Sequence, residues 1–258
     1  INKLERLYKT MKLKNKIAIV TGGASGFGAG IVRKFIAEGA KVVIADINNS
    51  LAEKLARELG EEAISAEVDV SDNISVKRLV ESTISKFETI DILVNNAGIG
   101  HQPQALDKLS EDDFDRIFNV NAKSVFYTAQ QVVPIMKIAK SGVILNVAST
   151  GGVSPRPNLT WYNASKGWMI TATKAMAVEL ASFGIRVNAI NPVAGKTPLL
   201  ATFMGEDTPE IREKFLSTIP MGRFSTPTDM GNTACFLCSD DASMITGIAM
   251  NVDGGRCI

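Results

Sequence analysis

The sequence predicts an α/β fold, a single domain with a doubly wound parallel sheet of about seven strands and helices on both of its faces. From Ile17 onward, short apolar runs alternate with longer amphipathic ones, which is typical of repeated βαβ units. The apolar runs are rich in Val and Ile and lack polar alternation, as expected for strands that are covered on both faces. No linker rich in Pro, Gly or Ser divides the chain. One domain is therefore the simpler interpretation.

The strands and helices follow from these two kinds of run. We expect strands at residues 17–21, 41–46, 63–69, 90–95, 142–149, 186–191 and 248–252. Between them, apolar residues recur with the helical period of 3.6. Leu51, Leu55 and Leu59 form one such stripe, and residues 79–87 contain another. Glycines favour the ends of helices, and they stand where three helices should stop: Gly39, Gly60 and Gly184.

Two segments depart from this alternation. Residues 1–12 are expected to form an N-terminal extension of a domain at 13–258, and apolar residues at helical spacing would let the extension pack as a short helix. At about 193–226 the strand and helix rhythm lapses. Because long irregular stretches in compact domains are usually functional lids, we expect one or two short helices over the substrate here. The apolar residues concerned would equally suit contact with a neighbouring subunit: Leu199, Leu200, Phe203, Met204, Phe215 and Leu216.

The composition favours a small-molecule partner. A net charge of +1 without a basic run predicts no binding to nucleic acid or to a membrane surface. No apolar stretch is long enough to span a bilayer and no signal-peptide core is present, so we expect the cytoplasm. Cys235 and Cys238 form a C-x-x-C, but His101 is the only histidine, so we expect no metal site. The two cysteines are interpreted as small apolar residues on a helix.

A glycine-rich turn follows the first expected strand and leads into an amphipathic helix. The N–H groups at a helix start carry partial positive charge, and glycines let a pyrophosphate approach the backbone without a Cβ in the way. Such a turn alone is weak evidence, but the strand before it and the helix after it favour a dinucleotide site. The residues of this expected site are Gly22, Ser25, Gly26, Phe27 and Gly28.

Asp46, at the end of the second expected strand, favours NAD over NADP. Its carboxylate is placed to accept hydrogen bonds from the adenosine ribose hydroxyls, and it would repel a 2′-phosphate. No arginine stands in the glycine turn or directly after Asp46 to neutralise such a phosphate. The alternative is an Asp that merely ends a strand before a turn. We therefore expect NAD as the cofactor, with Asp46 and Ile47 beside its adenosine.

Tyr162 and Lys166 stand one helical turn apart at the start of a long helical run, so both project from one face. Bringing a phenol pKa from about 10 to neutrality takes about three units, or ~4 kcal/mol. Because a fixed lysine charge favours the phenolate, we expect Lys166 to lower the pKa of Tyr162 and make it a general acid/base. A Tyr and Lys at this spacing are frequently only surface residues. Ser149 favours the catalytic interpretation, because it ends a strand at the sheet edge where doubly wound folds bind ligands.

Four motifs in this order make the chain resemble the short-chain dehydrogenase/reductase family, which has a Rossmann-like fold. They are the glycine turn at 21–28, Asn95-Asn96-Ala97-Gly98, Ser149, and Tyr-x-x-x-Lys at 162–166. These motifs are individually loose but jointly specific. The resemblance covers nearly everything from residue 14 to residue 255.

The resemblance implies hydride transfer between a nicotinamide and a secondary alcohol or ketone. Tyr162 would exchange the proton, Ser149 would hydrogen-bond the substrate oxygen, and Lys166 would hold the nicotinamide ribose. Asn121 would steady a water that joins Lys166 to solvent. The other cofactor contacts that the resemblance implies are Asp69, Val70, Asn95, Ala97, Gly98, Pro192, Val193 and Thr197. Val193 stands where Gly is common in the family, a departure that affects the backbone leading to Thr197.

The resemblance leaves the substrate open. Sugar and polyol dehydrogenases are similar, so we expect a small polar hydroxy compound. A 3-oxoacyl-[acyl-carrier-protein] reductase is the alternative, although such enzymes generally use NADPH and have Arg where Ser25 stands here. A non-catalytic dinucleotide-binding sensor is the alternative of another class, and the family resemblance implies a homotetramer. His101, Arg156 and Trp161 lie near the expected site, and for each a structural role is more frequent than substrate contact.

Overall fold

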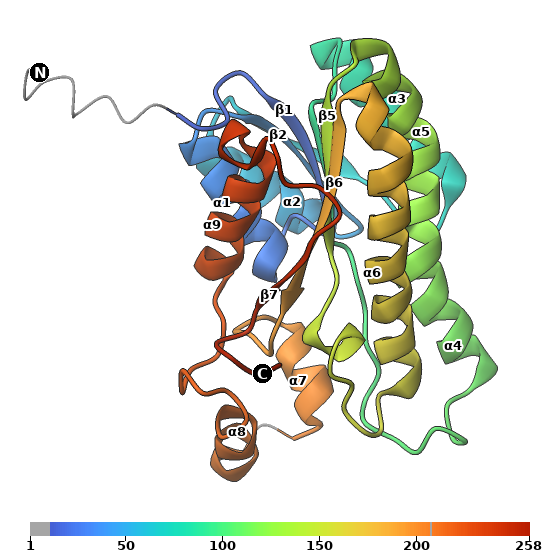
Figure 1. Ribbon diagram of the computed structural model, residues 1–258, viewed down its shortest axis with the longest axis vertical. Coiled ribbons are helices and arrows are strands. Elements are labelled where there is room, and N and C mark those ends of the chain that lie inside the picture. The colour runs from blue at the N-terminus through green and yellow to red at the C-terminus, as the bar shows by residue number, and fades with distance from the viewer. Residues whose placement is uncertain (1–10, 207) are drawn as a thin grey trace, which may run out of the picture.

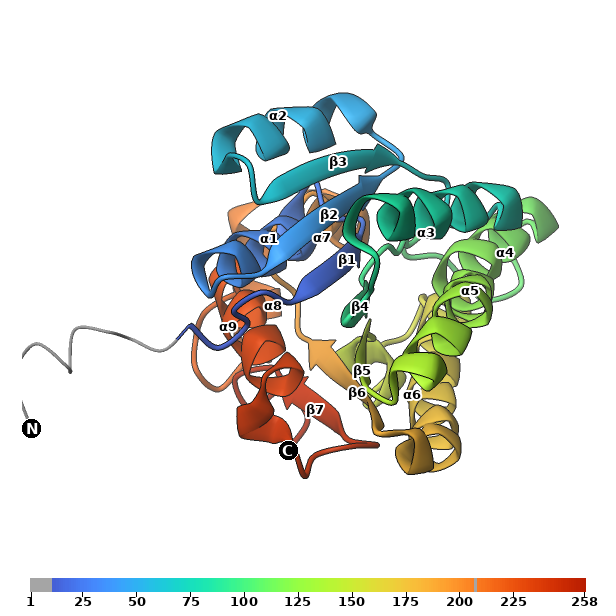
Figure 2. The same ribbon diagram turned by 90° about the horizontal axis from the view of Figure 1, so that it is seen from above.

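The computed structural model describes residues 11–206 and 208–258 of the chain. Its centre, seen in Figure 1, is a sheet of seven parallel strands, and their order β3-β2-β1-β4-β5-β6-β7 can be followed in Figure 2. The expected fold class is confirmed. The strands are β1 (Ile17–Thr21), β2 (Lys41–Asp46), β3 (Ala63–Glu67), β4 (Ile92–Asn95), β5 (Gly142–Val147), β6 (Ile185–Pro192) and β7 (Ala249–Val252).

The strand ends differ from the sequence expectation by a residue or two, and hydrogen bonding explains the end of β3. The sequence places that end at Asp69, whereas the strand stops at Glu67. The backbone N–H of Asp69 donates to Ser75 Oγ at 3.1 Å, at the start of the following helix, and so leaves the sheet ladder. The chain therefore leaves the sheet just after Glu67, at the carboxyl edge.

Helices cover both faces of the sheet, as Figure 2 shows from above. Apolar side chains of three helices form one core with one face of the sheet, and those of three others form a second core with the opposite face. The first layer is α1 (Gly26–Ala37), α2 (Asn49–Leu59) and α9 (Pro227–Cys238), and the second is α3 (Asn73–Phe87), α5 (Ser124–Ala139) and α6 (Thr160–Leu180). The helix α4 (Glu111–Phe118) reaches α5 through a π-helical turn at Asn119–Lys123.

The helix ends agree with the local sequence. The side chain of Asn48 accepts a hydrogen bond from the N–H of Leu51 and begins α2, and Gly60 ends it with φ of 84°, a left-handed conformation that favours glycine. Cys235 and Cys238 both lie in α9 with buried, free thiols, as the sequence interpretation holds. Among the described residues, no group of three or more His, Cys, Asp or Glu side chains could hold a metal ion.

The segment at 193–226 lies at the carboxyl end of the sheet (Figure 1). It contains the short helices α7 (Leu199–Met204) and α8 (Pro209–Leu216). Its two ends are held together, because Ser225 Oγ donates to the carbonyl of Val193 at 3.0 Å and the N–H of Lys196 donates to the carbonyl of Ser225 at 2.9 Å. Both termini of the segment are therefore fixed where β6 ends and α9 begins.

The short helix expected within residues 1–12 falls almost wholly on residues 1–10, which lie outside the described residues. Over the part of the chain that the structure describes, every helix is too short or too polar to cross a bilayer.

Candidate active site

A cavity of about 510 Å³ opens at the carboxyl ends of β1, β4, β5 and β6. This is the place where the strand order reverses, because β1 and β4 are neighbours in the sheet although two strands separate them in the chain. The cavity wall contains most of the residues that the sequence picks out for a cofactor and for catalysis. They are Gly22, Ser25, Gly26, Phe27, Asp46, Ile47, Asp69, Val70, Ala97, Gly98, Ser149, Tyr162, Lys166, Pro192, Val193 and Thr197.

The glycine turn offers backbone N–H groups to this cavity. Gly22 and Gly26 have φ of 59° and 52°, in the left-handed region. The N-cap residue of α1 is Ser25, whose side chain caps no backbone N–H, so those of the first helical turn are open to a ligand. Gly28 lies behind the wall, where an added Cβ would stand 2.0 Å from the carbonyl oxygen of Gly22. The turn thus forms a cradle for an anion, and Gly28 lets the turn fold tightly.

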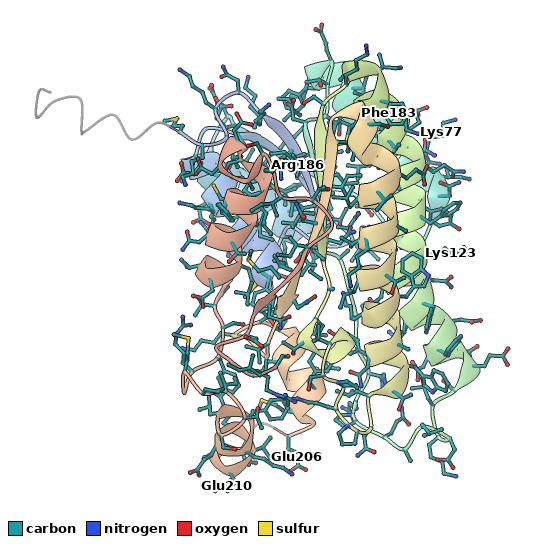
Figure 3. All side chains as sticks on the ribbon, in the orientation of Figure 1. Lys77, Lys123, Phe183, Arg186, Glu206 and Glu210 are labelled. Carbon is teal, nitrogen blue, oxygen red and sulfur yellow. The ribbon has the colours of Figure 1, made fainter. Side chains whose placement is uncertain are left out.

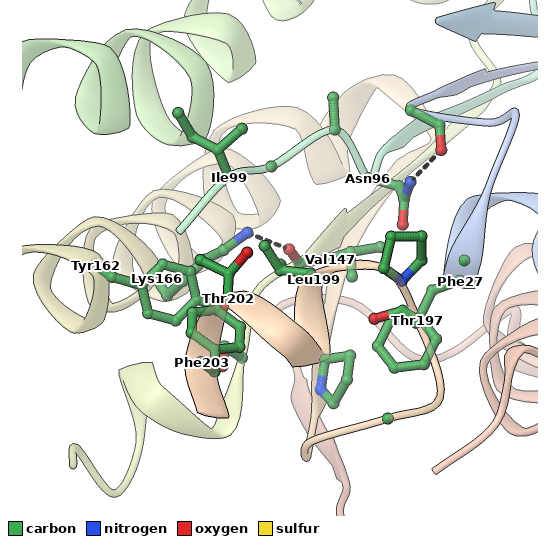
Figure 4. Close-up of a pocket in the computed structure, with 18 of the residues that line it drawn as sticks. Phe27, Asn96, Ile99, Val147, Tyr162, Lys166, Thr197, Leu199, Thr202 and Phe203 are labelled. Carbon is green, nitrogen blue, oxygen red and sulfur yellow. Dashed lines mark hydrogen bonds between the residues drawn. The ribbon is translucent and has the colours of Figure 1, made fainter. Parts of the chain in front are cut away.

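Thr21 and Asn96 tie the glycine turn to the end of β4. Thr21 Oγ1 accepts hydrogen bonds from the N–H groups of Asn96 and Ala97, each at 3.1 Å. Asn96 Nδ2 donates to the carbonyls of Thr21 and Gly22, each at 2.9 Å (Figure 4). Sequence reasoning missed Asn96 as an individual residue, although it stands in the motif that was quoted. A second Asn directly after a buried strand was the available signal.

Asn95 lies elsewhere than the sequence analysis places it. Its side chain is buried below the cavity, where Asn95 Nδ2 donates to Asn146 Oδ1 and its oxygen accepts from Thr128 Oγ1, each at 2.9 Å. Asn146 extends this series of hydrogen bonds, because its Nδ2 donates to Thr173 Oγ1 at 2.9 Å. The Asn95 side chain therefore links the sheet to α5 and α6, while the neighbouring Asn96 lines the cavity.

Acidic and apolar residues after β2 and β3 form the end of the cavity next to the glycine turn. One oxygen of Asp46 accepts the N–H of Ala24 and the other that of Asn48, both at 3.0 Å. This fixes the carboxylate at the cavity wall. Ile47 lines the same wall although its side chain is 69% exposed, so it offers an apolar surface to a flat ligand. Asp69 Oδ1 accepts from the N–H and the hydroxyl of Ser71.

The structure brings Ser149, Tyr162 and Lys166 to the wall of one cavity, in which Figure 4 labels Tyr162 and Lys166. Tyr162 and Lys166 project from one face of α6 and are 6% and 4% exposed. The ammonium of Lys166 donates to the carbonyl of Val147, at the end of β5, at 2.9 Å. Ser149 follows two residues later, and its hydroxyl accepts the N–H of Gly151 at 3.0 Å.

Burial decides the protonation of this pair. It raises the pKa of Tyr162 to about 12, and a hydrogen bond with Ser149 offsets part of that rise. It lowers the pKa of Lys166 to about 8. The expectation that Lys166 holds the pKa of Tyr162 near neutrality is therefore wrong for this arrangement. The physical reason is that burial disfavours the charged phenolate and likewise disfavours the charged form of Lys166.

Asn121 lies outside the cavity wall but beside it. Its side chain is fully buried in the π-helical turn, where Oδ1 accepts the N–H of Ile99 and Nδ2 donates to the carbonyl of Ile99, both at 2.9 Å. Nδ2 also donates to Ser165 Oγ at 3.0 Å. Near Gly98, an added Cβ would stand 3.2 Å from Lys166 Nζ and 3.4 Å from Asn121 Oδ1. Asn121 thus holds the loop after β4 against α6, at the side of Lys166.

The 193–226 segment closes the other side of the cavity. Val193 is buried and its N–H donates to the carbonyl of Val252 at 3.3 Å, so the backbone continues beside β7 without a glycine there. Thr197 reaches the glycine turn, since a Cβ on Gly26 would stand 3.2 Å from its side chain. The ring of Phe203 packs on the ring of Tyr162 with centroids 4.8 Å apart (Figure 4).

Of the three residues that the sequence analysis places near the site, His101, Arg156 and Trp161, only one lines the cavity. His101 is buried, with Nδ1 2.8 Å from the carbonyl of Gln102, and Trp161 donates to the carbonyl of Leu106 at 3.2 Å; neither lines the cavity. Arg156 does line it. Sequence reasoning missed Asn163, which also lines the wall and donates to the carbonyl of Arg156 at 2.8 Å.

A parallel doubly wound sheet, a glycine cradle at a helix start and a buried Ser, Tyr and Lys in one cavity define a dinucleotide-dependent oxidoreductase. The family profile described as "Enoyl-(Acyl carrier protein) reductase" matches residues 22–256. Together with the relatives given next, this match shows that the chain belongs to the short-chain dehydrogenase/reductase family.

Two curated relatives and one solved structure illustrate the membership. The chain is 48% identical to "4-formylbenzenesulfonate dehydrogenase TsaC1/TsaC2" of Comamonas testosteroni, over 95% of this chain and 99% of that protein. It is 37% identical to "Galactitol 2-dehydrogenase" of Agrobacterium fabrum, over 95% and 99%. A crystal structure of 3-ketoacyl-(acyl-carrier-protein) reductase from Brucella melitensis complexed with NADH superposes with a TM-score of 0.92 and 50% identity, covering 95% of this chain and all of that one.

Proposed function

We propose that this chain is an NAD(H)-dependent oxidoreductase that interconverts a secondary alcohol and a ketone. The single observation that carries the proposal is the presence of Ser149, Tyr162 and Lys166 on one wall of a cavity that also contains the glycine cradle. A dinucleotide sensor needs the cradle and Asp46 but has no use for a buried phenol beside a buried ammonium. This favours the enzyme over the sensor.

The residues of the cavity suit a dinucleotide. The cradle would accept a pyrophosphate, because Gly22 has no Cβ to narrow the cavity. A Cβ there would lie 2.9 Å from the Cα of Ala97. Asp46 would accept the ribose hydroxyls, and Ile47 and Val70 would contact the adenine. Lys166 would hold the second ribose, and Thr197 the carboxamide. When bound, NAD(H) supplies the donor or acceptor of the hydride.

The chain's own groups would handle the proton and the substrate oxygen. With its pKa raised by burial, Tyr162 is protonated at neutral pH and would give its proton to the oxygen of a ketone that is being reduced. Ser149 would donate a hydrogen bond to the same oxygen and position it. In the oxidising direction the phenolate must form, and the ammonium of Lys166 is the positive charge on this face of α6 that favours it. Asn121 would hold Lys166 in reach by fixing the loop at Ile99.

Asp46 supports the preference for NAD over NADP, as does the solved relative complexed with NADH. The expected sugar or polyol substrate stays a prediction, for which the galactitol 2-dehydrogenase relative gives support. The second candidate is a 3-oxoacyl-[acyl-carrier-protein] reductase, supported by a relative of that name from Thermotoga maritima that is 41% identical. NADH-linked reduction of an acetoacetyl thioester in preference to free ketones would favour this second candidate.

The cytoplasm and a homotetramer are further parts of the proposal. Large apolar side chains are exposed on the outer faces of α5 and α6, which supports contacts between copies of the chain there. They are Phe126, Ile138, Trp168 and Val178. Size-exclusion chromatography with light scattering would test the assembly, and a monomer at micromolar concentration would contradict it.

The experiment for the catalytic proposal is Tyr162→Phe, assayed with NAD on a panel of secondary alcohols, sugars and polyols and with NADH on ketones. Loss of the proton donor should lower kcat by about 10²- to 10⁴-fold, while the affinity for NADH, read from its fluorescence, stays nearly unchanged. Tyr127→Phe, on α5 and away from the cavity, is the matched control. Turnover by Tyr162→Phe at the wild-type rate would reject the mechanism.

A further inference from the structure

Arg156 is a charged residue in the cavity wall for which neither hydride nor proton transfer has a use. It lies in the loop between β5 and α6, at the end of the cavity that Tyr162 and the 193–226 segment form. Asn163 Nδ2 donates to the Arg156 carbonyl at 2.8 Å, and Asn163 directly follows Tyr162 in α6. The backbone of Arg156 is therefore held in a fixed position relative to the reacting hydroxyl.

Among the described residues, the cation–π and hydrogen-bond partners of the Arg156 guanidinium, Phe215 and Thr218, are both neutral. The guanidinium lies over the ring of Phe215, 4.4 Å from the centroid, and donates one hydrogen bond to Thr218 Oγ1 at 3.3 Å. Among residues 11–206 and 208–258, no carboxylate forms an ion pair with it. An arginine carries several N–H donors in a planar fork, so most of them are left for a ligand.

A second arginine increases the positive charge at the Arg156 end of the cavity. Arg256, from the C-terminal segment, is close enough to Arg156 to lower its pKa together with burial, the larger cause. Its Nη1 donates to Ser154 Oγ at 3.3 Å, and its Nε is buried without a partner. The acidic side chain of the same segment, Asp253, accepts the N–H groups of Gly255 and Cys257. Among the described residues, neither of these two neighbouring arginines forms an ion pair with a carboxylate.

Arg186, labelled in Figure 3, shows how this chain satisfies a half-buried arginine that serves the fold alone. Its two terminal nitrogens donate to backbone carbonyls of Leu237, Ile245 and Ser239. These bonds join β6 to the end of α9. Arg156 has no such set of carbonyls, and this difference argues against a purely structural role for it.

Apolar side chains make up much of the rest of the wall at this end, with Asn163 and Thr202 as polar members. The apolar side chains that face the same cavity near Tyr162 and Arg156 are Ile99, Leu159, Leu199, Leu200, Phe203 and Phe215. A sugar or polyol would place its hydroxyls against these side chains and would leave the guanidinium charge uncompensated. An apolar body with one negative end would match both features.

We propose that Arg156 binds a carboxylate or sulfonate at the end of the substrate opposite the reacting carbon, so that the enzyme selects an oxo or hydroxy compound with an apolar body and one anionic group. This inference rests on the proposed function, because it assigns the substrate class to the same cavity. Arg256 adds positive charge near Arg156. Charge-assisted, bidentate pairing of the guanidinium supplies the recognition.

The test compares ketones of one shape that differ in charge. The enzyme with NADH is given 4-acetylbenzoate, 4-acetylbenzenesulfonate and the neutral 4-methylacetophenone. The wild type should reduce the anionic ketones with a kcat/KM about 10- to 100-fold above that of the neutral one. Arg156→Met removes the charge but retains an apolar chain to pack on Phe215, so it should abolish this preference by raising the KM of the anionic ketones. Arg57→Met, an exposed arginine of α2, is the charge-matched control.

A binding measurement separates this inference from the proposed function. Calorimetry of 4-methylbenzenesulfonate with the enzyme–NADH complex should show binding that Arg156→Met weakens at least about 10-fold, with NADH affinity and melting temperature unchanged. If the sulfonate binds in this way but no ketone is reduced, the anion subsite stands and the proposed reaction fails. If neutral ketones are reduced as well as anionic ones, if the sulfonate does not bind, or if Arg156→Met weakens NADH instead, the subsite is rejected.

Discussion

The two ends of the cavity are built from different parts of the chain. At the cofactor end the glycine turn contributes backbone to the wall beside the side chains of Asp46 and Ile47, and an added Cβ at Gly22 or Gly28 would collide with neighbouring main chain. At the substrate end the wall is made of side chains, and contacts such as that of Phe203 with Tyr162 join segments far apart in the sequence. A backbone cradle fits one ligand shape, whereas exchangeable side chains determine which substrate enters. The general reaction and its particular substrate are thus encoded in separate places.

Lys166 lies where the two ends meet, and its replacement is expected to have the largest effect. Lys166→Met should lower kcat by about 10²- to 10⁴-fold, because it removes the ammonium that favours the phenolate and holds the ribose. It should also stabilise the fold. Burial lowers the pKa of Lys166 from 10.5 to about 8, so keeping it charged at pH 7 costs about 3 kcal/mol relative to the unfolded chain.

The predicted gain in folding stability of Lys166→Met can be checked by its dependence on pH. In the folded wild type Lys166 binds its proton less tightly than in the unfolded chain, so the penalty is complete below pH about 8 and fades as the pH rises toward 10.5. Thermal unfolding at pH 7 should therefore give Lys166→Met a melting temperature a few degrees above that of the wild type, and the difference should shrink by pH 10. Lys174→Met, in the same helix, is the control. A variant less stable than the wild type at pH 7 would show that Lys166 contributes to the fold.

The comparison also explains what the sequence could predict. The seven strands and the glycine turn depend on apolar runs and on glycines within a few residues of one another, so local pattern predicts them. Tyr162 and Lys166 share a helix, and Ser149 follows the preceding strand. Arg156 was noticed, but its neutral surroundings arise from Phe215 and Thr218, far away in the sequence. No local pattern contains such a contact.

Two expectations from the sequence, the position of the Asn95 side chain and the pKa of Tyr162, differ from the structure for the same reason. The Asn95 side chain is directed inward by a polar chain that runs through Asn146 to Thr173, on β5 and α6. The pKa of Tyr162 is set by burial under Phe203 and other distant residues, a quantity that spacing along a helix does not contain. Adjacent residues and short motifs therefore identify the reacting groups, while packing between distant segments sets their direction and their protonation.

A substitution of Asp46 tests the cofactor end, and its effect on cofactor preference is expected to be of intermediate size. Asp46→Asn keeps the shape but removes the negative charge that would repel a 2′-phosphate. The ratio of kcat/KM with NADH to that with NADPH should fall by about 10-fold or more, because like-charge repulsion costs at least ~1.4 kcal/mol at such distances. Asp69→Asn lies on the same wall after β3, and it should weaken both cofactors alike. An unchanged ratio in Asp46→Asn would discredit the assignment of NAD to this residue.

Phe203 tests the substrate end, where the smallest effect is expected. Its ring covers that of Tyr162 and touches Gly100, where an added Cβ would stand 2.5 Å from the phenyl ring. Phe203→Ala should uncover the phenol, lower its pKa from about 12 toward 10, and reduce kcat/KM by only a few-fold, because the cradle and the Ser149, Tyr162 and Lys166 set remain. An ultraviolet titration of tyrosinate measures the shift, with Tyr162→Phe as the blank that identifies the residue. Since the 193–226 segment is anchored at Val193 and Ser225, the melting temperature should change little. A large loss of NADH affinity in Phe203→Ala would contradict the division of the cavity into two separately built ends, because it would show that the side chains of this segment also build the cofactor end.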